Sequence, residues 1–241
     1  MQFENTIGAG GDHRARGRGH LKQARSFLTK MGQSGSLSIT GGALSVTGAK
    51  PGDSSYNTVI GDYGSGTLTI SGGGQLNSTF GFLGYNLPAV AGDPRSSGTV
   101  TITGANSKWS TSFLDIGSSG TGLMTVENGG ALTSSGQLNL GRDIGASGTL
   151  TVRSGSTASG VTVRIGAHTA GSGAVTVDGT GSVFTASSTM TVGFAGTGTV
   201  NGTLDVTNGG KVVATGGLSI TGRGTVTLDG ATSVIQAGSV S

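Results

Sequence analysis

The chain has 241 residues, among them 50 glycines, 3 prolines and no cysteine, and its 14 basic and 11 acidic side chains give a formal net charge of +3. The absence of cysteine excludes a disulfide framework, a thiol nucleophile and a thiolate metal site, and the low proline content excludes a collagen-like helix. No apolar run reaches the roughly 18 residues that a transmembrane helix needs, so we expect no membrane-spanning segment.

Residues 1–34 differ in charge from the rest of the chain. The first 32 residues hold six basic and two acidic side chains. Basic segments of this kind bind nucleic acid or anionic surfaces in some proteins and are solvated leaders in most. Because no aromatic residues are interleaved with the basic ones, we expect no specific nucleic-acid partner. The segment is predicted to be a poorly ordered leader, partly helical over about residues 20–31.

From residue 35 to residue 241 the chain repeats one phrase, which reads Gly, small, apolar, Thr, apolar. Each copy continues through a polar glycine turn and a second short strand to a third strand, which often ends in an apolar residue and Gly. Successive copies are 22 to 32 residues apart. The copies begin at Gly35, Gly66, Gly98, Gly122, Gly148, Gly173, Gly202 and Gly224.

The repeat predicts an all-β solenoid. Alternation of apolar residues and threonine is typical of a strand with one buried face, as in Leu68 and Ile70 against Thr67 and Thr69. One copy has too little apolar surface to fold alone, whereas stacked copies bury a continuous aliphatic column. We therefore expect residues 35–241 to form a right-handed, single-stranded parallel β-helix of about eight coils.

One stretch carries a recognisable pattern. From Gly98 it reads GTVTITGANSKWSTSFLDIGSSGTGLMTVENGGALTSSGQLNLG, and its features are the segment T-V-x-[IV]-x-G-x-x-S-x-W, the later apolar residue followed by Gly, and the turn after T-V. This stretch resembles the repeats of bacterial autotransporter (type V secretion) passengers and of PEP-CTERM-associated surface proteins. Weaker copies, with an aliphatic residue or Phe in place of Trp109, extend the resemblance over residues 35–241.

The resemblance implies a β-helical passenger displayed on the cell surface or secreted, exported across a Gram-negative outer membrane and often adhesive. Neither a signal peptide nor a C-terminal membrane barrel is visible in the sequence. The chain is therefore expected to be a passenger fragment without its translocator β-barrel. The expected partners are glycans or proteins of host or environmental surfaces.

Few residues suggest catalysis. Nucleotide-binding and hydrolase motifs are missing, the three histidines are scattered, and we expect no cofactor and no metal. Alignment of the copies places Glu127, Arg153 and Asp178 on successive rungs, just after the first strand. A carbohydrate-active β-helix would use such a cluster for acid–base work or glycan binding. We favour a structural ladder of alternating charge.

A second column consists of hydroxyl groups. Thr69, Thr101, Thr125, Thr151, Thr176 and Thr227 are expected to line one outer face. A flat threonine grid is how some solenoids bind ice, but threonine is also a favoured strand residue. The interruptions at Leu123, Ala174 and Asp205 argue against an ice-binding surface.

Two further sets of residues are expected to have structural roles. Trp109, the aromatic residue of the family motif, is expected to pack beside the coil and not to stack on sugars. Asp62, Asp115 and Asp143 are interpreted as turn residues that cap their own backbone. The function predicted from the sequence is thus a non-enzymatic, adhesive or structural surface protein. The alternatives are a carbohydrate-active or carbohydrate-binding β-helix and an ice-binding solenoid.

Overall fold

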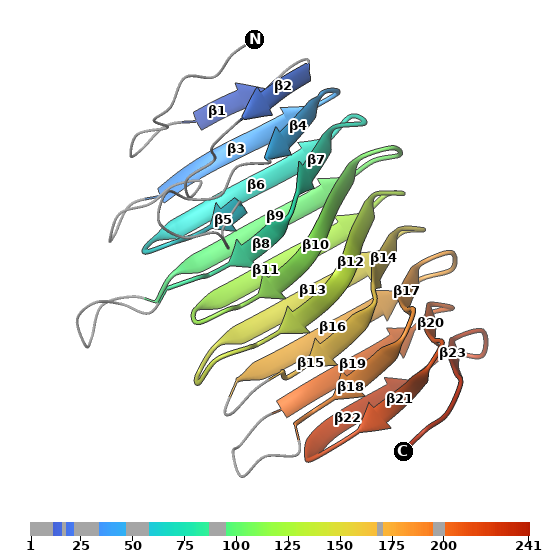
Figure 1. Cartoon of the computed structure of the whole chain (residues 1–241). Helices are drawn as coiled ribbons and strands as arrows, with labels where there is room; N and C mark the ends of the chain where they lie inside the picture. The colour runs from blue at the N-terminus through green and yellow to red at the C-terminus, as the bar shows by residue number, and fades with distance from the viewer. Residues whose placement is uncertain are drawn as a thin grey trace.

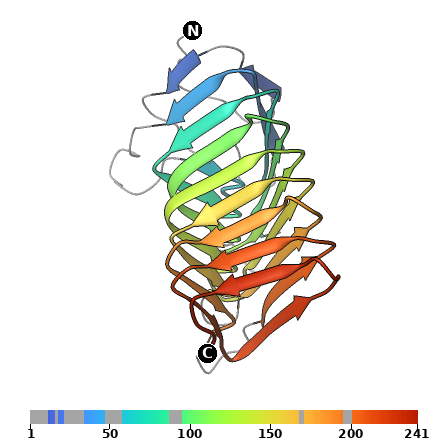
Figure 2. The ribbon, with the colours of Figure 1, turned by 90° about the vertical axis from the view of Figure 1, so that its right-hand side faces the viewer.

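The computed structural model describes residues 12–15, 18–21, 34–46, 58–86, 95–167, 171–194 and 201–241. Within these residues every regular element is a β-strand, and every strand pairing is parallel. The strands stack rung upon rung from the N-terminal end to the C-terminal end (Figures 1 and 2). The expected all-β parallel solenoid is confirmed.

The first face of the solenoid, called face 1 below, is a nine-stranded parallel sheet. Strands that are neighbours in this sheet come from successive copies of the repeat. The chain therefore moves to the next rung each time it completes a turn. The strands are, in order, β1 (Asp12–Ala15), β3 (Ser34–Thr40), β6 (Ser65–Ser71), β9 (Ser97–Thr103), β11 (Thr121–Glu127), β13 (Ser147–Arg153), β16 (Ser172–Asp178), β19 (Asn201–Thr207) and β22 (Arg223–Leu228).

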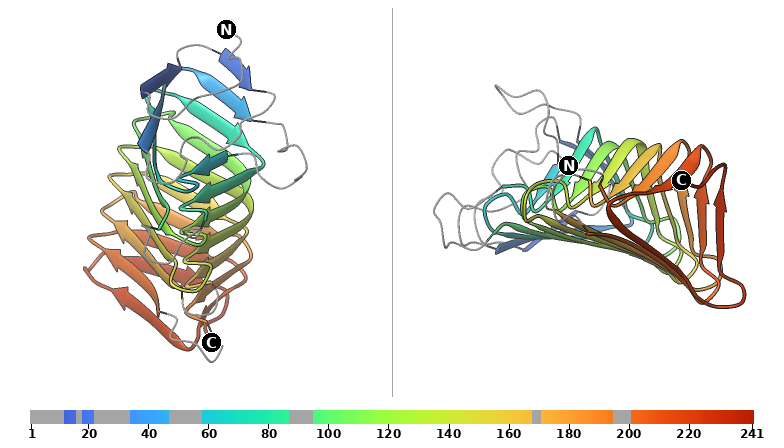
Figure 3. Two further views of the ribbon diagram at one scale, coloured as in Figure 1. Left: turned by 90° about the vertical axis from the view of Figure 1, so that its left-hand side faces the viewer. Right: turned by 90° about the horizontal axis from the view of Figure 1, so that it is seen from below.

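Two further faces complete each turn, and Figure 3 shows them from two other sides. Face 2 consists of β2 (Arg18–Leu21), β4 (Ala43–Val46), β7 (Gln75–Ser78), the first halves of β10 (Lys108–Ile116) and β12 (Ala131–Leu140), β14 (Thr157–Gly160), β17 (Val183–Ala186), β20 (Lys211–Ala214) and β23 (Val234–Ala237). Face 3 consists of β5 (Thr58–Ile60), β8 (Phe80–Leu83), the second halves of β10 and β12, β15 (Thr162–Ile165), β18 (Thr189–Val192) and β21 (Gly217–Ile220).

Turns in which all three faces are described run from β3 to β21 and are slightly fewer than the eight coils expected. The last copy of the repeat, at Gly224, contributes β22 and β23. In its third position it makes only an isolated bridge between Leu218 and Val240. On face 3 the final rung thus has a bridge where the earlier rungs have a strand.

The core is a column of aliphatic side chains inside the coil. Leu68 and Ile70 are buried, whereas Thr67 is exposed and Thr69 is half-buried, as the alternation predicts. The same pattern recurs on all three faces, because inward residues of successive rungs lie directly above one another. Burial of this continuous column supplies the apolar stabilisation that a single copy lacks.

From the second copy onward, the glycine that opens each copy is required by close backbone contact. A Cβ added to Gly148 would lie 1.9 Å from the carbonyl oxygen of Ile116, the last residue of β10. The glycine that follows the third strand has a second reason as well: a Cβ on Gly117 would lie 2.0 Å from the carbonyl oxygen of Ser147, and Gly117 also adopts a φ of +71°, which side chains disfavour. These two requirements explain why the repeat keeps Gly at both places.

Trp109 lies inside the coil, so the expectation that it packs beside the coil is wrong. Its side chain is completely buried and belongs to the core. In the register of face 2, Trp109 faces Leu132, Leu132 faces Ala158, and Ala158 faces Phe184. Large and small inward residues thus share the interior of the coil.

The leader segment 1–34 is described only in part. Residues 12–15 and 18–21 form β1 and β2, which pair with β3 and β4 and extend faces 1 and 2 by one rung. His20 and Leu21 therefore belong to a strand, and the expectation that a helix begins at about residue 20 is wrong for these two residues. The remainder of the expected helix, residues 22–31, lies outside the described residues.

Candidate functional site

The charged column consists of the last residues of three successive strands of face 1, which are Glu127 in β11, Arg153 in β13 and Asp178 in β16. Arg153 donates from Nε and Nη2 to the same oxygen of Glu127, Oε2, at 2.9 and 2.6 Å. Arg153 and Asp178 are aligned by the register of β13 and β16. The three residues therefore occupy successive rungs, and Glu127 and Arg153 form an ion pair at the surface.

Asp178 bonds towards the next rung. Its Oδ1 accepts hydrogen bonds from Thr207 Oγ1 at 2.8 Å and from Asn208 Nδ2 at 2.6 Å. These two hydrogen bonds, with a smaller contribution from the charge of Arg153, hold the pKa of Asp178 below its usual range. Asp178 is thus an ionised carboxylate that links two rungs.

The hydroxyl column lies on face 1 in strict register. Each residue faces its counterpart on the next rung, and these side chains point away from the core. The column reads Ser38, Thr69, Thr101, Thr125, Thr151, Thr176, Asp205 and Thr227.

A second hydroxyl column runs parallel to the first, two residues earlier in each strand. It reads Ser36, Thr67, Thr99, Leu123, Thr149, Ala174, Thr203 and Thr225. Leu123 interrupts it with a side chain that is 43% exposed. Face 1 is therefore a long and mostly hydroxylated surface with a few interruptions.

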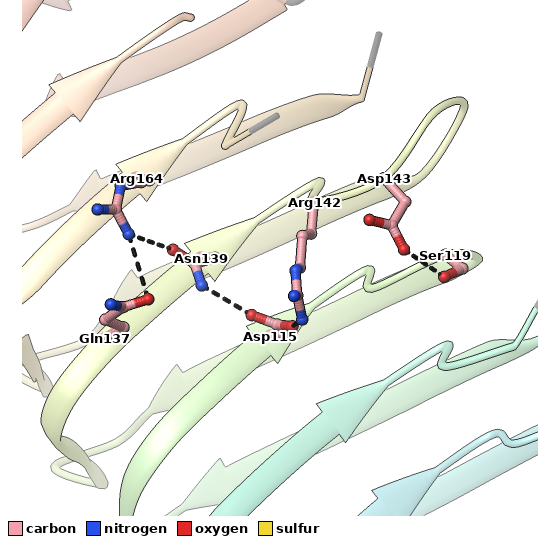
Figure 4. A network of polar contacts seen from close by, with 7 residues as sticks. All are labelled: Asp115, Ser119, Gln137, Asn139, Arg142, Asp143 and Arg164. Carbon is pink, nitrogen blue, oxygen red and sulfur yellow. Dashed lines mark hydrogen bonds and ion pairs between the residues drawn. The ribbon is translucent and has the colours of Figure 1, made fainter. Parts of the chain in front are cut away.

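A polar network on face 3 was not recognised in the sequence (Figure 4). Asp115 Oδ1 accepts a hydrogen bond from Asn139 Nδ2 at 2.8 Å. Asp115 Oδ2 forms an ion pair with Arg142 Nη1 at 2.7 Å. On the next rung Arg164 Nη1 donates to Gln137 Oε1 at 3.2 Å and to Asn139 Oδ1 at 3.5 Å. Three rungs are thereby connected through side chains.

The interpretation of Asp115 as a turn residue is wrong. It lies in β10 between the inward residues Leu114 and Ile116, and its own side chain is completely buried on the outer side of the sheet. Burial raises the pKa of Asp115, although the hydrogen bonds from Asn139 and Arg142 oppose the rise.

The other two aspartates of that set also bond across rungs. Asp143 accepts a hydrogen bond from the hydroxyl of Ser119 at 2.6 Å. Asp62 accepts one from the side-chain amide of Asn86. Both contacts join consecutive turns between face 3 and face 1, so these aspartates hold the loops of neighbouring rungs together.

A recurring sequence feature would have located the network. Asp115, Asn139 and Arg164 each stand two residues before the glycine that follows the third strand, in LDIG, LNLG and VRIG. Alignment on that glycine places them in one outward column, in the register that the structure has. Phe82 and Thr191 occupy the same column on flanking rungs.

Aromatic rings lie beside this network. The ring centroids of Phe113 and Phe80 are 6.0 Å apart, those of Phe113 and Phe82 are 5.8 Å apart, and Tyr85 meets Phe82 edge-on at 5.0 Å. The guanidinium carbon of Arg142 is 6.0 Å from the centroid of Phe113. Phe80 and Phe113 are half-buried on the outer side of face 3. The outer side of face 3 therefore carries aromatic side chains on the earlier rungs and charged side chains on the rungs that follow.

Among the described residues, no group of three or more His, Asp or Glu side chains is arranged to hold a metal ion. Nor does the described part of the chain contain a helix long and apolar enough to cross a membrane.

Comparison with known proteins finds no family model, no curated protein and no solved structure that matches this chain. Its function has to be inferred from its own residues and their arrangement.

Proposed function

We propose that this protein is a non-enzymatic adhesive solenoid whose binding surface is the hydroxylated face 1. The observation that carries this proposal is the strict register of two hydroxyl columns along the stacked strands. Neighbouring rungs repeat at about 4.8 Å, so the face presents donors and acceptors at regular intervals along its length.

Such a surface suits a long, repetitive ligand. Each hydroxyl contributes a weak hydrogen bond in competition with water. The strands hold the hydroxyls in place before binding, so little conformational freedom is lost on association. Many weak contacts to one polymer then add up, which is the multivalent basis of adhesion. A polysaccharide chain, itself rich in hydroxyl groups, is the ligand class that this chemistry favours.

The hydrogen bonding of the charged column supports a non-catalytic role. Glu127 is paired with Arg153, and Asp178 is held by Thr207 and Asn208. A general acid works best with a pKa near the operating pH, whereas the pKa of Asp178 is lowered. The column is better suited to joining rungs than to cleaving a glycosidic bond.

The proposed location is outside the cell, as part of an exported passenger. This part of the proposal rests on the resemblance of residues 35–241 to the repeats of autotransporter passengers and PEP-CTERM-associated surface proteins. A solenoid that is stable through stacking alone is compatible with that role, because each rung needs only its neighbours.

The test is retention of the full chain on immobilised neutral polysaccharides, cellulose and chitin, measured by surface plasmon resonance. The variant Thr101→Val/Thr125→Val/Thr151→Val removes three hydroxyls of face 1 and keeps β-branched side chains. The matched control Ser110→Ala/Thr133→Val/Ser159→Ala removes three half-buried hydroxyls from face 2 of the same three rungs.

The proposal predicts binding to at least one of these polymers, an affinity about tenfold lower in the face 1 variant, and little change in the face 2 control. Release of reducing ends from either polymer would contradict the non-enzymatic role. Absence of binding, or equal losses in the two variants, would contradict face 1 as the adhesive surface.

A further inference from the structure

Arg164 carries a positive charge without a carboxylate partner among the described residues. Its side chain is half-buried on face 3, and the acceptors of its Nη1 are the amide oxygens of Gln137 and Asn139. The ion pairs within the described residues are those of Arg142 with Asp115 and of Arg153 with Glu127. Because a guanidinium has five N–H donors, most of those of Arg164 remain available for a ligand.

The position of Arg164 is set by a relay of hydrogen bonds. Asn139 donates from Nδ2 to the buried carboxylate of Asp115, which orients its Oδ1 towards Arg164. The carboxylate of Asp115 is in turn neutralised by Arg142. Asn139 therefore separates Arg164 from the carboxylate of Asp115, and the relay holds the guanidinium in place without cancelling its charge (Figure 4).

Two aromatic side chains, Phe80 and Phe113, lie on the outer side of face 3 at the N-terminal end of this network. The outer column next to Asn139 reads Phe80, Phe113, Gln137 and Thr162 on successive rungs. Phe113 and Arg164 are two rungs apart, which corresponds to about 10 Å along the stack. A polymer lying along face 3 would thus meet an aromatic ring and a guanidinium in turn, and sugar rings pack on aromatic faces while guanidinium binds anions.

We propose that Arg164, together with Arg142 and Phe113 on the preceding two rungs, forms a binding site for an acidic polysaccharide that carries carboxylate or sulfate groups. Arg164 pairs with the anionic group, since its planar fork matches both oxyanions, and Phe113 contacts a sugar ring. The site lies on face 3 and does not depend on whether the hydroxylated face 1 is adhesive.

The experiment measures binding of the full chain to immobilised heparin, which is sulfated, to polygalacturonate, which carries only carboxylates, and to uncharged dextran. The key variant is Arg164→Gln. The matched control is Lys211→Gln, which removes the same charge from an exposed lysine of face 2, outside both proposed binding surfaces.

The basic residues of the leader would also bind polyanions without sequence or site specificity. Both variants are therefore measured again in a chain that carries Arg16→Gln, Lys22→Gln, Arg25→Gln and Lys30→Gln. A third variant, Arg164→Lys, keeps the charge and removes the fork geometry.

The proposal predicts that Arg164→Gln weakens binding to heparin or polygalacturonate about tenfold or more, that Arg164→Lys weakens it less, and that Lys211→Gln changes it little. A loss on heparin alone indicates a site for sulfate, and a loss on polygalacturonate indicates a site for carboxylate. Equal losses for Arg164→Gln and Lys211→Gln, equal retention on dextran, or no binding to either acidic polymer would overturn the proposal. Failure of the face 1 test on cellulose and chitin would leave these outcomes unchanged, so the two proposals are separable.

Discussion

Trp109 occupies the space that a side chain at residue 81 would fill. A Cβ added to Gly81 would lie 2.7 Å from Cζ2 of the indole ring and 2.9 Å from Cδ1 of Leu114. The ring is completely buried, and its Nε1 donates a hydrogen bond to Ser78 Oγ at 3.0 Å. A mostly aliphatic coil thus accommodates one bicyclic ring because the facing strand, β8, has no side chain at that point.

Gly81→Ala is therefore expected to lower the free energy of unfolding by about 1–3 kcal/mol, since overpacking forces its neighbours out of position. Trp109→Phe removes the atoms nearest the new methyl group, so the double variant should lose less than the sum of the two single variants. Chemical denaturation of all four chains measures the coupling. Full additivity would mean that the two residues do not contact each other.

Inward and outward residues of one strand should differ sharply in their effect on stability. Ile102 is completely buried in β9, whereas Thr101 faces outward and is half-buried. We expect Ile102→Ala to cost about 2–5 kcal/mol through transfer and cavity effects, and Thr101→Ala to cost less than about 1 kcal/mol. Val226→Ala provides a comparison on the last rung, where Val226 is only partly buried, and should cost less than Ile102→Ala. Equal losses at residues 101 and 102 would contradict the register of face 1.

The buried carboxylate of Asp115 should make stability depend on pH. Its pKa is raised above the ordinary 3.8, chiefly by burial, so the folded chain keeps the proton to a higher pH than the unfolded chain does. The stability that this proton contributes is present below the ordinary pKa and is lost as the pH rises through the raised pKa.

Asp115→Asn cannot titrate, so it should gain stability relative to the unmodified chain between about pH 3 and about pH 7. Urea unfolding of both proteins at the two pH values measures the change. Asp178→Asn, at a carboxylate whose pKa is lowered, should change in the opposite direction. A change of the same sign in both variants would contradict the assignment.

The ion pair between Glu127 and Arg153 should contribute little to stability. The side chain of Arg153 is 51% exposed and that of Glu127 is 20% exposed, and exposed pairs are weakened by water and salt. A double-mutant cycle with Glu127→Gln and Arg153→Gln is expected to give a coupling energy below about 1 kcal/mol that decreases as salt is added. A coupling of several kcal/mol that is insensitive to salt would indicate a buried role for this pair.

The repeat predicted the fold because its residues serve stacking directly. The glycine that opens each copy, the alternating apolar residues and the outward threonines all recur at the same point of each rung. Gly122 faces Gly148, and Thr125 faces Thr151, as the alignment of copies indicates. The hydroxyl and charge columns could be placed on rungs for the same reason.

The face 3 network is harder to predict because its members differ in residue type from copy to copy. Asp115, Asn139 and Arg164 share only their position two residues before the glycine that follows the third strand, and the register of that strand brings them into one column. Arg142 reaches back one rung from a turn, a contact that no alignment indicates. The sequence does not predict a place for Trp109 inside the coil, because the space for its ring exists only where Gly81 of β8 faces inward.

Every surface proposed above depends on in-register stacking of the copies of the repeat. The chain has no cysteine, so pairs of spin labels can be attached at introduced cysteines on face 1. In the outer column, Thr176 lies four rungs from Thr69, and Thr227 lies six rungs from it. Pulsed electron paramagnetic resonance on Thr69→Cys/Thr176→Cys and Thr69→Cys/Thr227→Cys should give narrow distributions corresponding to backbone separations of about 19 Å and about 29 Å. Broad distributions, or two separations that do not increase with the number of rungs, would contradict the stacked solenoid and the surfaces that depend on it.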